Sequence, residues 1–180
     1  MSRAVSVCLI PVLFGALLAS GPAHADVKSV RITVRVTCVY CGKLSRSRLE
    51  KLPGVERTTV SVLPPYMEVR IRKGAWPDLT KMQAIIRDIG EFPDPGGLIL
   101  VVSGKVLGDG NRLLLNVDGV QPARTVELHV KEGSPAAKFL REHPAAPVEV
   151  TGHLHYAEAS TGVPAAEVLE VTSARAETGH

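Results

Sequence analysis

Cysteine is scarce in this chain, and its scarcity limits the chemistry open to the protein. Only Cys8, Cys38 and Cys41 are present among 180 residues. Zinc generally takes four protein ligands, and two cysteines three positions apart supply only two of them. Two neighbouring thiolates instead suit a soft ion that accepts linear two-coordination. We therefore expect soft-metal or thiol chemistry to depend on the motif Cys38-Val39-Tyr40-Cys41.

The chain also lacks an apolar run of ordinary transmembrane length. The run from Ala4 to Leu18 is interrupted and falls short of the roughly 20 residues that a spanning helix needs. Because Arg3 precedes it and Ala23-His24-Ala25 follows it, residues 1–25 are predicted to be a cleaved export signal that takes the first cysteine with it. The mature chain would begin at Asp26 and be periplasmic or secreted; an uncleaved membrane anchor is the rival interpretation.

Common catalytic signatures are absent as well. The sequence holds no Gly-x-Ser-x-Gly, no His-Glu-x-x-His and no phosphate-binding glycine loop, so the protein is predicted not to be an enzyme. Aromatic residues make up only 4% of the chain. Nucleic-acid binding needs stacking aromatics and a positive track, and residues 93–180 offer little beyond Phe139 and Tyr156. We therefore expect no nucleic-acid partner.

Charge divides the chain into a basic and an acidic part. Residues 27–92 hold 13 Lys and Arg against 6 Asp and Glu, a net of +7, whereas residues 93–180 hold 7 against 11, a net of −4. A cluster rich in Pro and Gly, residues 92–97, marks the change and contains the residues that interrupt regular structure most strongly. The sequence predicts two domains, at residues 26–95 and 96–174, followed by a tail at 175–180.

In the first domain, hydrophobic periodicity predicts the order strand, helix, strand, strand, helix. Val30, Ile32 and Val34 alternate with polar residues, as in a half-buried strand. A short amphipathic helix follows at residues 41–52, and further strands are expected around Val60 and Met67. Pro77-Asp78 is a typical start for the second helix, and Gly90 a typical end.

This order, with the cysteine pair between the first strand and the first helix, resembles the heavy-metal-associated domain family, over about residues 28–92. Leu52-Pro53-Gly54-Val55 and Gly90-Glu91-Phe92 are further points of similarity. The family includes copper chaperones and the mercury-binding periplasmic protein. The resemblance implies a ferredoxin-like fold, whose last strand would be Leu98–Val102 or missing.

The resemblance also implies that Cys38 and Cys41 bind the metal, with Cu(I) favoured and Hg(II) or another soft metal second. Val36 stands where the family usually has a methionine that supports the loop. Val36, Thr37, Tyr40 and Lys43 are expected to support or cover the site. The partner would be a metal donor or acceptor protein, such as a membrane transporter.

Two other interpretations of the cysteine pair remain open. Thiols outside the cytoplasm normally oxidise, so the pair could be a structural disulfide in an interaction protein that binds no metal. Cys-x-x-Cys at the start of a helix is also the arrangement of thiol–disulfide redox proteins. The dipeptide Val39-Tyr40 differs from the Gly-Pro or Pro-His usual between such cysteines.

The second domain is predicted to be a small OB-like β-barrel, by pattern only. Strands are expected at residues 98–106, 113–117, 125–130, 148–156 and 168–172, with one helix after Ser134-Pro135. Gly104 would allow the sharp bend that a barrel needs. His153 and His155 would share a strand face, and with His129 they form a weak candidate imidazole site for a divalent metal. The predicted fold class is thus α+β, a ferredoxin-like unit followed by an OB-like barrel.

Overall fold

The computed structural model describes residues 25–34, 38–90, 93–109, 112–156 and 167–177. Eight strands and three helices lie in these ranges, and none of those helices has the length and apolar character required to cross a bilayer. The elements follow one another in this order: β1 (Val27–Val34), α1 (Val39–Leu49), β2 (Val55–Val62), β3 (Pro65–Ile71), α2 (Leu79–Asp88), β4 (Pro93–Asp109), β5 (Arg112–Val117), β6 (Arg124–Val130), α3 (Pro135–Glu142), β7 (Pro147–Tyr156) and β8 (Glu167–Ala176).

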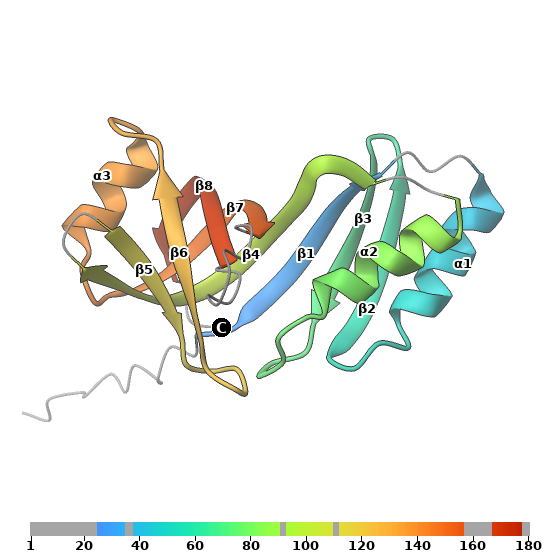
Figure 1. Ribbon diagram of the computed structural model, residues 1–180, viewed down its shortest axis with the longest axis horizontal. Helices are drawn as coiled ribbons and strands as arrows, with labels where there is room; N and C mark the ends of the chain where they lie inside the picture. The colour runs from blue at the N-terminus through green and yellow to red at the C-terminus, as the bar shows by residue number, and fades with distance from the viewer. Residues whose placement is uncertain (1–24, 35–37, 91–92, 110–111, 157–166, 178–180) are drawn as a thin grey trace, which may run out of the picture.

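All eight strands belong to one sheet, in the order β2-β3-β1-β4-β5-β6-β8-β7. A further pairing between β4 and β7 closes the last five strands into a barrel. Only β6 and β8 pair in parallel, and the other pairs are antiparallel. Figure 1 shows the barrel with α3 at one end of the molecule and the remaining strands with α1 and α2 at the other.

The long strand β4 joins these two parts. Its first residues pair with β1, the stretch from Ile99 to Lys105 pairs with β7, and the last residues pair with β5. At Gly104, where pairing passes from β7 to β5, an added Cβ would lie 2.6 Å from the carbonyl oxygen of Asn116. The chain can make this close approach only because glycine has no side chain.

The predicted fold class, α+β with a ferredoxin-like unit and a separate OB-like barrel, is wrong. The described part of the chain is mostly β, with 52% strand, 22% helix and a closed five-stranded barrel. The Pro and Gly cluster suggested a break, but Pro93 pairs with Val34 and begins β4. Proline is tolerated at the first residue of a strand, so the cluster does not interrupt the sheet. The predicted division between residues 95 and 96 lies inside β4.

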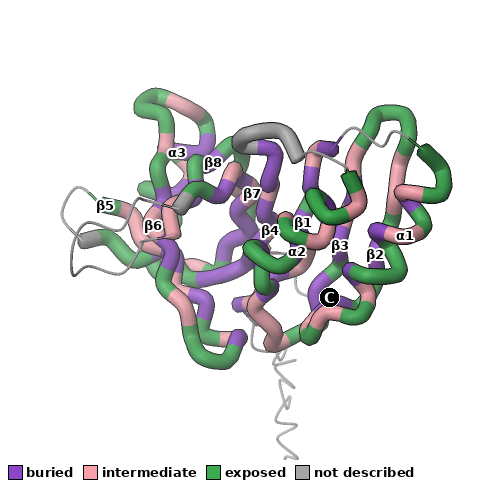
Figure 2. Tube along the Cα trace, turned by 45° about the vertical axis from the view of Figure 1, so that its right-hand side comes forward, coloured by how far each residue is buried: buried purple, intermediate pink, exposed green. Residues whose placement is uncertain are grey.

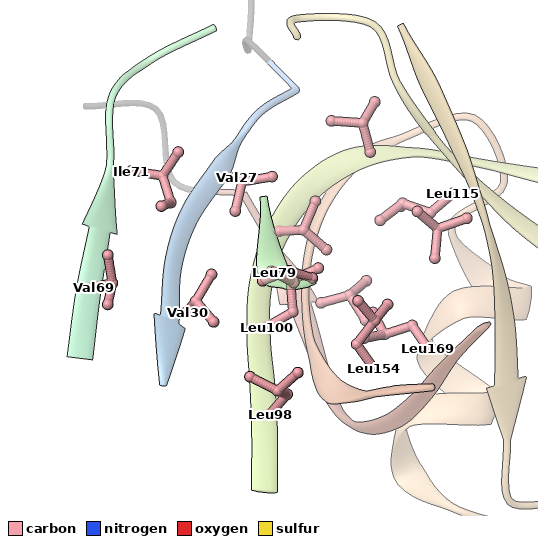
Figure 3. Packing of buried hydrophobic residues seen from close by; sticks show 14 of the residues in the cluster. Val27, Val30, Val69, Ile71, Leu79, Leu98, Leu100, Leu115, Leu154 and Leu169 are labelled. Carbon is pink, nitrogen blue, oxygen red and sulfur yellow. The ribbon is translucent and has the colours of Figure 1, made fainter. Parts of the chain in front are cut away.

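One apolar core runs through the whole sheet. Cross-strand register places Val30 of β1 opposite Leu100 of β4, which in turn lies opposite Gly152 of β7. The sheet face that α1 and α2 cover therefore continues into the interior of the barrel. Figure 3 shows Leu98 and Leu100 of β4 between the buried side chains of β1 and β3 and those of the barrel. Buried segments follow the strands, whereas exposed ones lie along the outer helix surfaces and turns (Figure 2).

Glu149 lies at the centre of an ion-pair cluster that links β1, β7 and β8. Its carboxylate lies 2.9 Å from Lys28 Nζ and also accepts a hydrogen bond from Arg175, while Lys28 Nζ lies 3.5 Å from Glu177 Oε1. Burial raises the pKa of Glu149, but the hydrogen bonds from Lys28 and Arg175 outweigh it and hold the pKa below its ordinary value. Burial likewise lowers the pKa of Lys28, but the bond to Glu149 and the nearby carboxylates raise it overall. Arg175 thus belongs to β8 rather than to the predicted tail.

We expect Gly104→Ala to destabilise the barrel, because its methyl group would overlap the Asn116 carbonyl and the side chain of Leu115. Overpacking of this kind costs about 1–3 kcal/mol. Gly108→Ala is the matched control, because it lies on the same strand with open space around its Cβ position. Urea unfolding followed by circular dichroism measures both, and equal midpoints for the two variants would contradict the close approach.

We expect Glu149→Gln to lower the free energy of unfolding by about 1–3 kcal/mol at neutral pH. Because folding lowers the pKa of Glu149, its contribution is present above the ordinary value near 4.5 and is lost as the pH falls below it. The difference between wild type and variant should therefore shrink on acidification. Glu68→Gln is the control, because its ion pair with Arg31 is exposed and worth about 1 kcal/mol or less. A difference that stayed constant down to pH 3 would exclude this role for Glu149.

Candidate functional site: the cysteine pair at the start of helix α1

Cys38 and Cys41 form the start of α1. Cys38 is the N-cap, and its Sγ accepts a hydrogen bond from the backbone N–H of Cys41 at 3.0 Å. The N–H of Gly42 donates to the carbonyl oxygen of Cys38 at 3.1 Å. The two sulfur atoms lie at bonding distance from each other, and the two Cα atoms are 5.2 Å apart. The two cysteines therefore form a disulfide, and Cys38 is exposed to solvent.

Helix α1 is anchored by its buried side and by hydrogen bonds at its C-terminal end, which fixes the position of the cysteines at its start. Gly42, Ser45 and Leu49 are buried on the side of α1 that faces the sheet. At the C-terminal end, Glu50 accepts hydrogen bonds from the backbone N–H of Thr58 on β2 and from Arg46 Nε, both at 3.0 Å. The bond from Thr58 is the main cause of the lowered pKa of Glu50. The helix is thus fixed to β2 at one end and presents its other end to solvent.

The residues between the cysteines are exposed rather than packed. Val39 is 71% exposed and Tyr40 is 73% exposed. Tyr40 was predicted to support or cover the site, and in the structure its side chain is largely exposed to solvent. Val36 and Thr37, the other two loop residues predicted to support the site, lie outside the described residues.

Lys43 is the cation of α1 nearest to the cysteines, and it is exposed. Arg46 pairs with Glu50, and Arg48 lies 3.7 Å from Asp88. Within the described ranges Lys43 makes no ion pair, and the first turn of α1 contains no acidic residue. The electrostatic surroundings of the sulfurs on this helix are therefore positive, which favours thiolate over thiol.

The three histidines predicted as an imidazole site lie on neighbouring strands of the barrel. Glu170 of β8 is the register partner of both His129 on β6 and His153 on β7, and it lies 3.3 Å from His155 Nε2. His129 itself lies 3.5 Å from Glu127. In the described part of the chain, no group of three His, Cys, Asp or Glu side chains could hold a metal. The imidazole site stays a prediction without added support.

The donor set at the start of α1 fits a soft ion. Reduction would release two sulfur ligands close together on one helical turn, and soft thiolate donors select ions such as Cu(I). A tetrahedral zinc site would need two more ligands, which the described residues do not bring to the pair. The oxidised pair can instead exchange with external thiols, so its geometry is compatible with either chemistry.

The sequence analysis did not single out the tip of the turn between β2 and β3 as an exposed apolar surface. Val62, the last residue of β2, is 59% exposed, and the adjacent Leu63 is 90% exposed. The available signal was the position of these apolar residues directly before Pro64-Pro65, a pair typical of a turn. Alternation within the strand gave no reason to place them at a protruding tip.

Ala25, the last residue of the predicted signal, is buried, and its carbonyl group lies against Gly119. The rest of the predicted signal lies outside the described residues. Comparison of the sequence with protein-family models and with curated proteins finds no match. The resemblance to the heavy-metal-associated domain family therefore stays a prediction.

Proposed function

We propose that the protein, once its cysteines are reduced, binds one soft metal ion as cargo between Cys38 and Cys41, with Cu(I) ahead of Hg(II). The observation that supports this most is the position of both sulfurs on the exposed first turn of α1, with Cys38 Sγ already accepting a backbone N–H. Such a position stabilises the anionic sulfur that a metal requires. The family resemblance points to the same two residues.

Exposure of the pair also suits transfer of the ion. Two sulfurs leave coordination positions open, so thiolates of a donor or acceptor protein can enter before the first bonds break. Cys38, Val39 and Tyr40 are all exposed, and a partner can therefore reach the ion from solvent. We propose holding or passing of the ion outside the cytoplasm, in line with the predicted export signal.

We expect reduced protein comprising residues 26–180 to bind one Cu(I) per chain in competition with a chromophoric chelator. Cys38→Ser should lower the affinity by more than the roughly 10- to 100-fold that changes around a metal site cost, because a ligand itself is lost. Serine is a good N-cap, so the helix should survive the substitution. Ser45→Ala on the buried side of α1 is the control variant. Equal affinity in wild type and Cys38→Ser would refute the metal proposal.

Thiol–disulfide exchange is the second candidate, favoured by the sulfurs lying at bonding distance. A substrate thiolate would attack the exposed Cys38 sulfur, break its bond to Cys41 and release Cys41 as a thiolate at the start of the helix. A second substrate thiolate would then displace Cys38 and complete the substrate disulfide. Two electrons pass from the substrate dithiol to the cysteine pair.

We expect the pair to equilibrate with glutathione, because its exposed end gives thiols access. Its reduction potential should lie above about −300 mV, the level below which structural disulfides resist the glutathione pool. Alkylation of free thiols after incubation in glutathione buffers, read by mass spectrometry, measures it. A pair that stayed oxidised in every buffer would be a structural disulfide, and both proposals would then fail.

A further inference from the structure

Exposed apolar side chains gather at the end of the molecule that carries the cysteines. Within the described ranges five large apolar side chains are exposed, and four of them lie on the first turn of α1 or at the turn between β2 and β3. These four are Val39, Tyr40, Val62 and Leu63, which are 71%, 73%, 59% and 90% exposed. We call the surface made by residues 38–41 and 62–63 the cysteine end.

Sheet register explains why two distant segments share this end. Thr33, near the end of β1, pairs with Tyr66, near the start of β3, and Val62 pairs with Pro65 across the turn. The chain reaches Cys38 shortly after β1 ends, so the start of α1 lies at the same end of these strands as the β2–β3 turn. Figure 1 and Figure 2 both show the β2–β3 turn and the start of α1 at this end of the strands.

Among the residues whose side chains the structure describes, the exposed charges around the cysteine end include two cations. Lys43 is exposed on α1, and Arg87 is exposed in the last turn of α2, which ends shortly before Pro93 pairs with the last residue of β1. Neither cation forms an ion pair in the part of the chain that the structure describes. Asp88, the nearby acid, is paired with Arg48. Exposed cations of the described chain thus lie near the apolar tips.

We propose that the cysteine end docks onto a membrane surface that carries anionic headgroups, with Leu63 and Tyr40 entering the boundary between headgroups and acyl chains. Two separate protruding tips fit a deformable apolar layer, and tyrosine favours the level of the headgroups. Lys43 and Arg87 would bind the lipid phosphates. This inference does not rest on the proposed function, since it depends on Leu63 and Tyr40 rather than on the sulfurs.

Co-sedimentation with vesicles tests the proposal. Protein comprising residues 26–180 keeps every described residue except Ala25 and lacks the apolar run of the predicted signal. We expect it to bind vesicles of equal parts phosphatidylglycerol and phosphatidylcholine, and to bind phosphatidylcholine alone much more weakly. Leu63→Ser and Tyr40→Ser should each weaken binding about tenfold, the effect of withholding a large apolar group from the boundary. Lys43→Glu should weaken binding only to the anionic vesicles.

Leu107→Ser is the matched control, because Leu107 is the fifth exposed apolar side chain, at 44%, and lies on the barrel part of β4. It should bind vesicles like the wild type. Circular dichroism and the Cu(I) titration should be unchanged in Leu63→Ser, which separates loss of docking from loss of the fold or of the metal site. The proposal is overturned if wild type does not bind the anionic vesicles, or if Leu107→Ser loses as much binding as Leu63→Ser. A protein contact at the cysteine end would then be the better interpretation.

Discussion

The structure depends on the continuity of β4 through both parts of the single sheet, the helix-covered part and the barrel. One strand supplies backbone hydrogen bonds to β1, β7 and β5, and it turns from one partner to the next at a glycine that almost touches the opposite backbone. Unpaired backbone groups are costly when they are buried, so this strand cannot shift its register without breaking several ladders at once. The barrel and the helix-covered part therefore share one core rather than two.

This arrangement leaves the cysteines exposed at the end of the strands where β1 finishes and α1 begins. α1 and α2 cover one face of the sheet, and the barrel lies at the other end of the molecule, so the barrel does not cover the β2–β3 turn or the start of α1 (Figure 1). Burial of Leu49 and the hydrogen bond between Glu50 and β2 hold the distant end of α1. The first turn of α1, which carries the cysteines, is thus exposed while the other end of the helix is held to the sheet, as the proposed exchange of a metal ion with a partner requires.

Local structure was largely predictable from the sequence, whereas the architecture was not. Alternation in β1, and the caps Asp78 and Ser134, correctly located a strand and two helices, because these signals come from near neighbours in the chain. The error came from Pro93 to Gly97, where local composition indicated a break and pairing with β1 overrode it. A contact between residues about 60 positions apart leaves no mark on local composition.

Of the candidate site, the cysteine pair and its position at a helix start were predictable from the sequence. Cys38 and Cys41 stand out in the sequence because no other thiol remains after the predicted signal, and the structure places them at a helix start as expected. The disulfide and the nearby Lys43 involve residues close together in the chain, and both were among the possibilities considered from the sequence. The position of the exposed tip at Leu63 beside the cysteines depends on segments more than 20 positions apart, so the sequence did not indicate it.

The ion cluster around Glu149 has a consequence for the order of folding. Lys28 is among the first described residues of the chain, and Arg175 and Glu177 are among the last. Glu149 pairs with both Lys28 and Arg175, and Lys28 also pairs with Glu177. β1 also lies inside the sheet, between β3 and β4, so it must wait for strands made later. Since contacts between the two ends form only when the whole chain is present, a nascent chain whose last strand is still inside the ribosome cannot complete this sheet. The native state is therefore reached only after the last strand has been released.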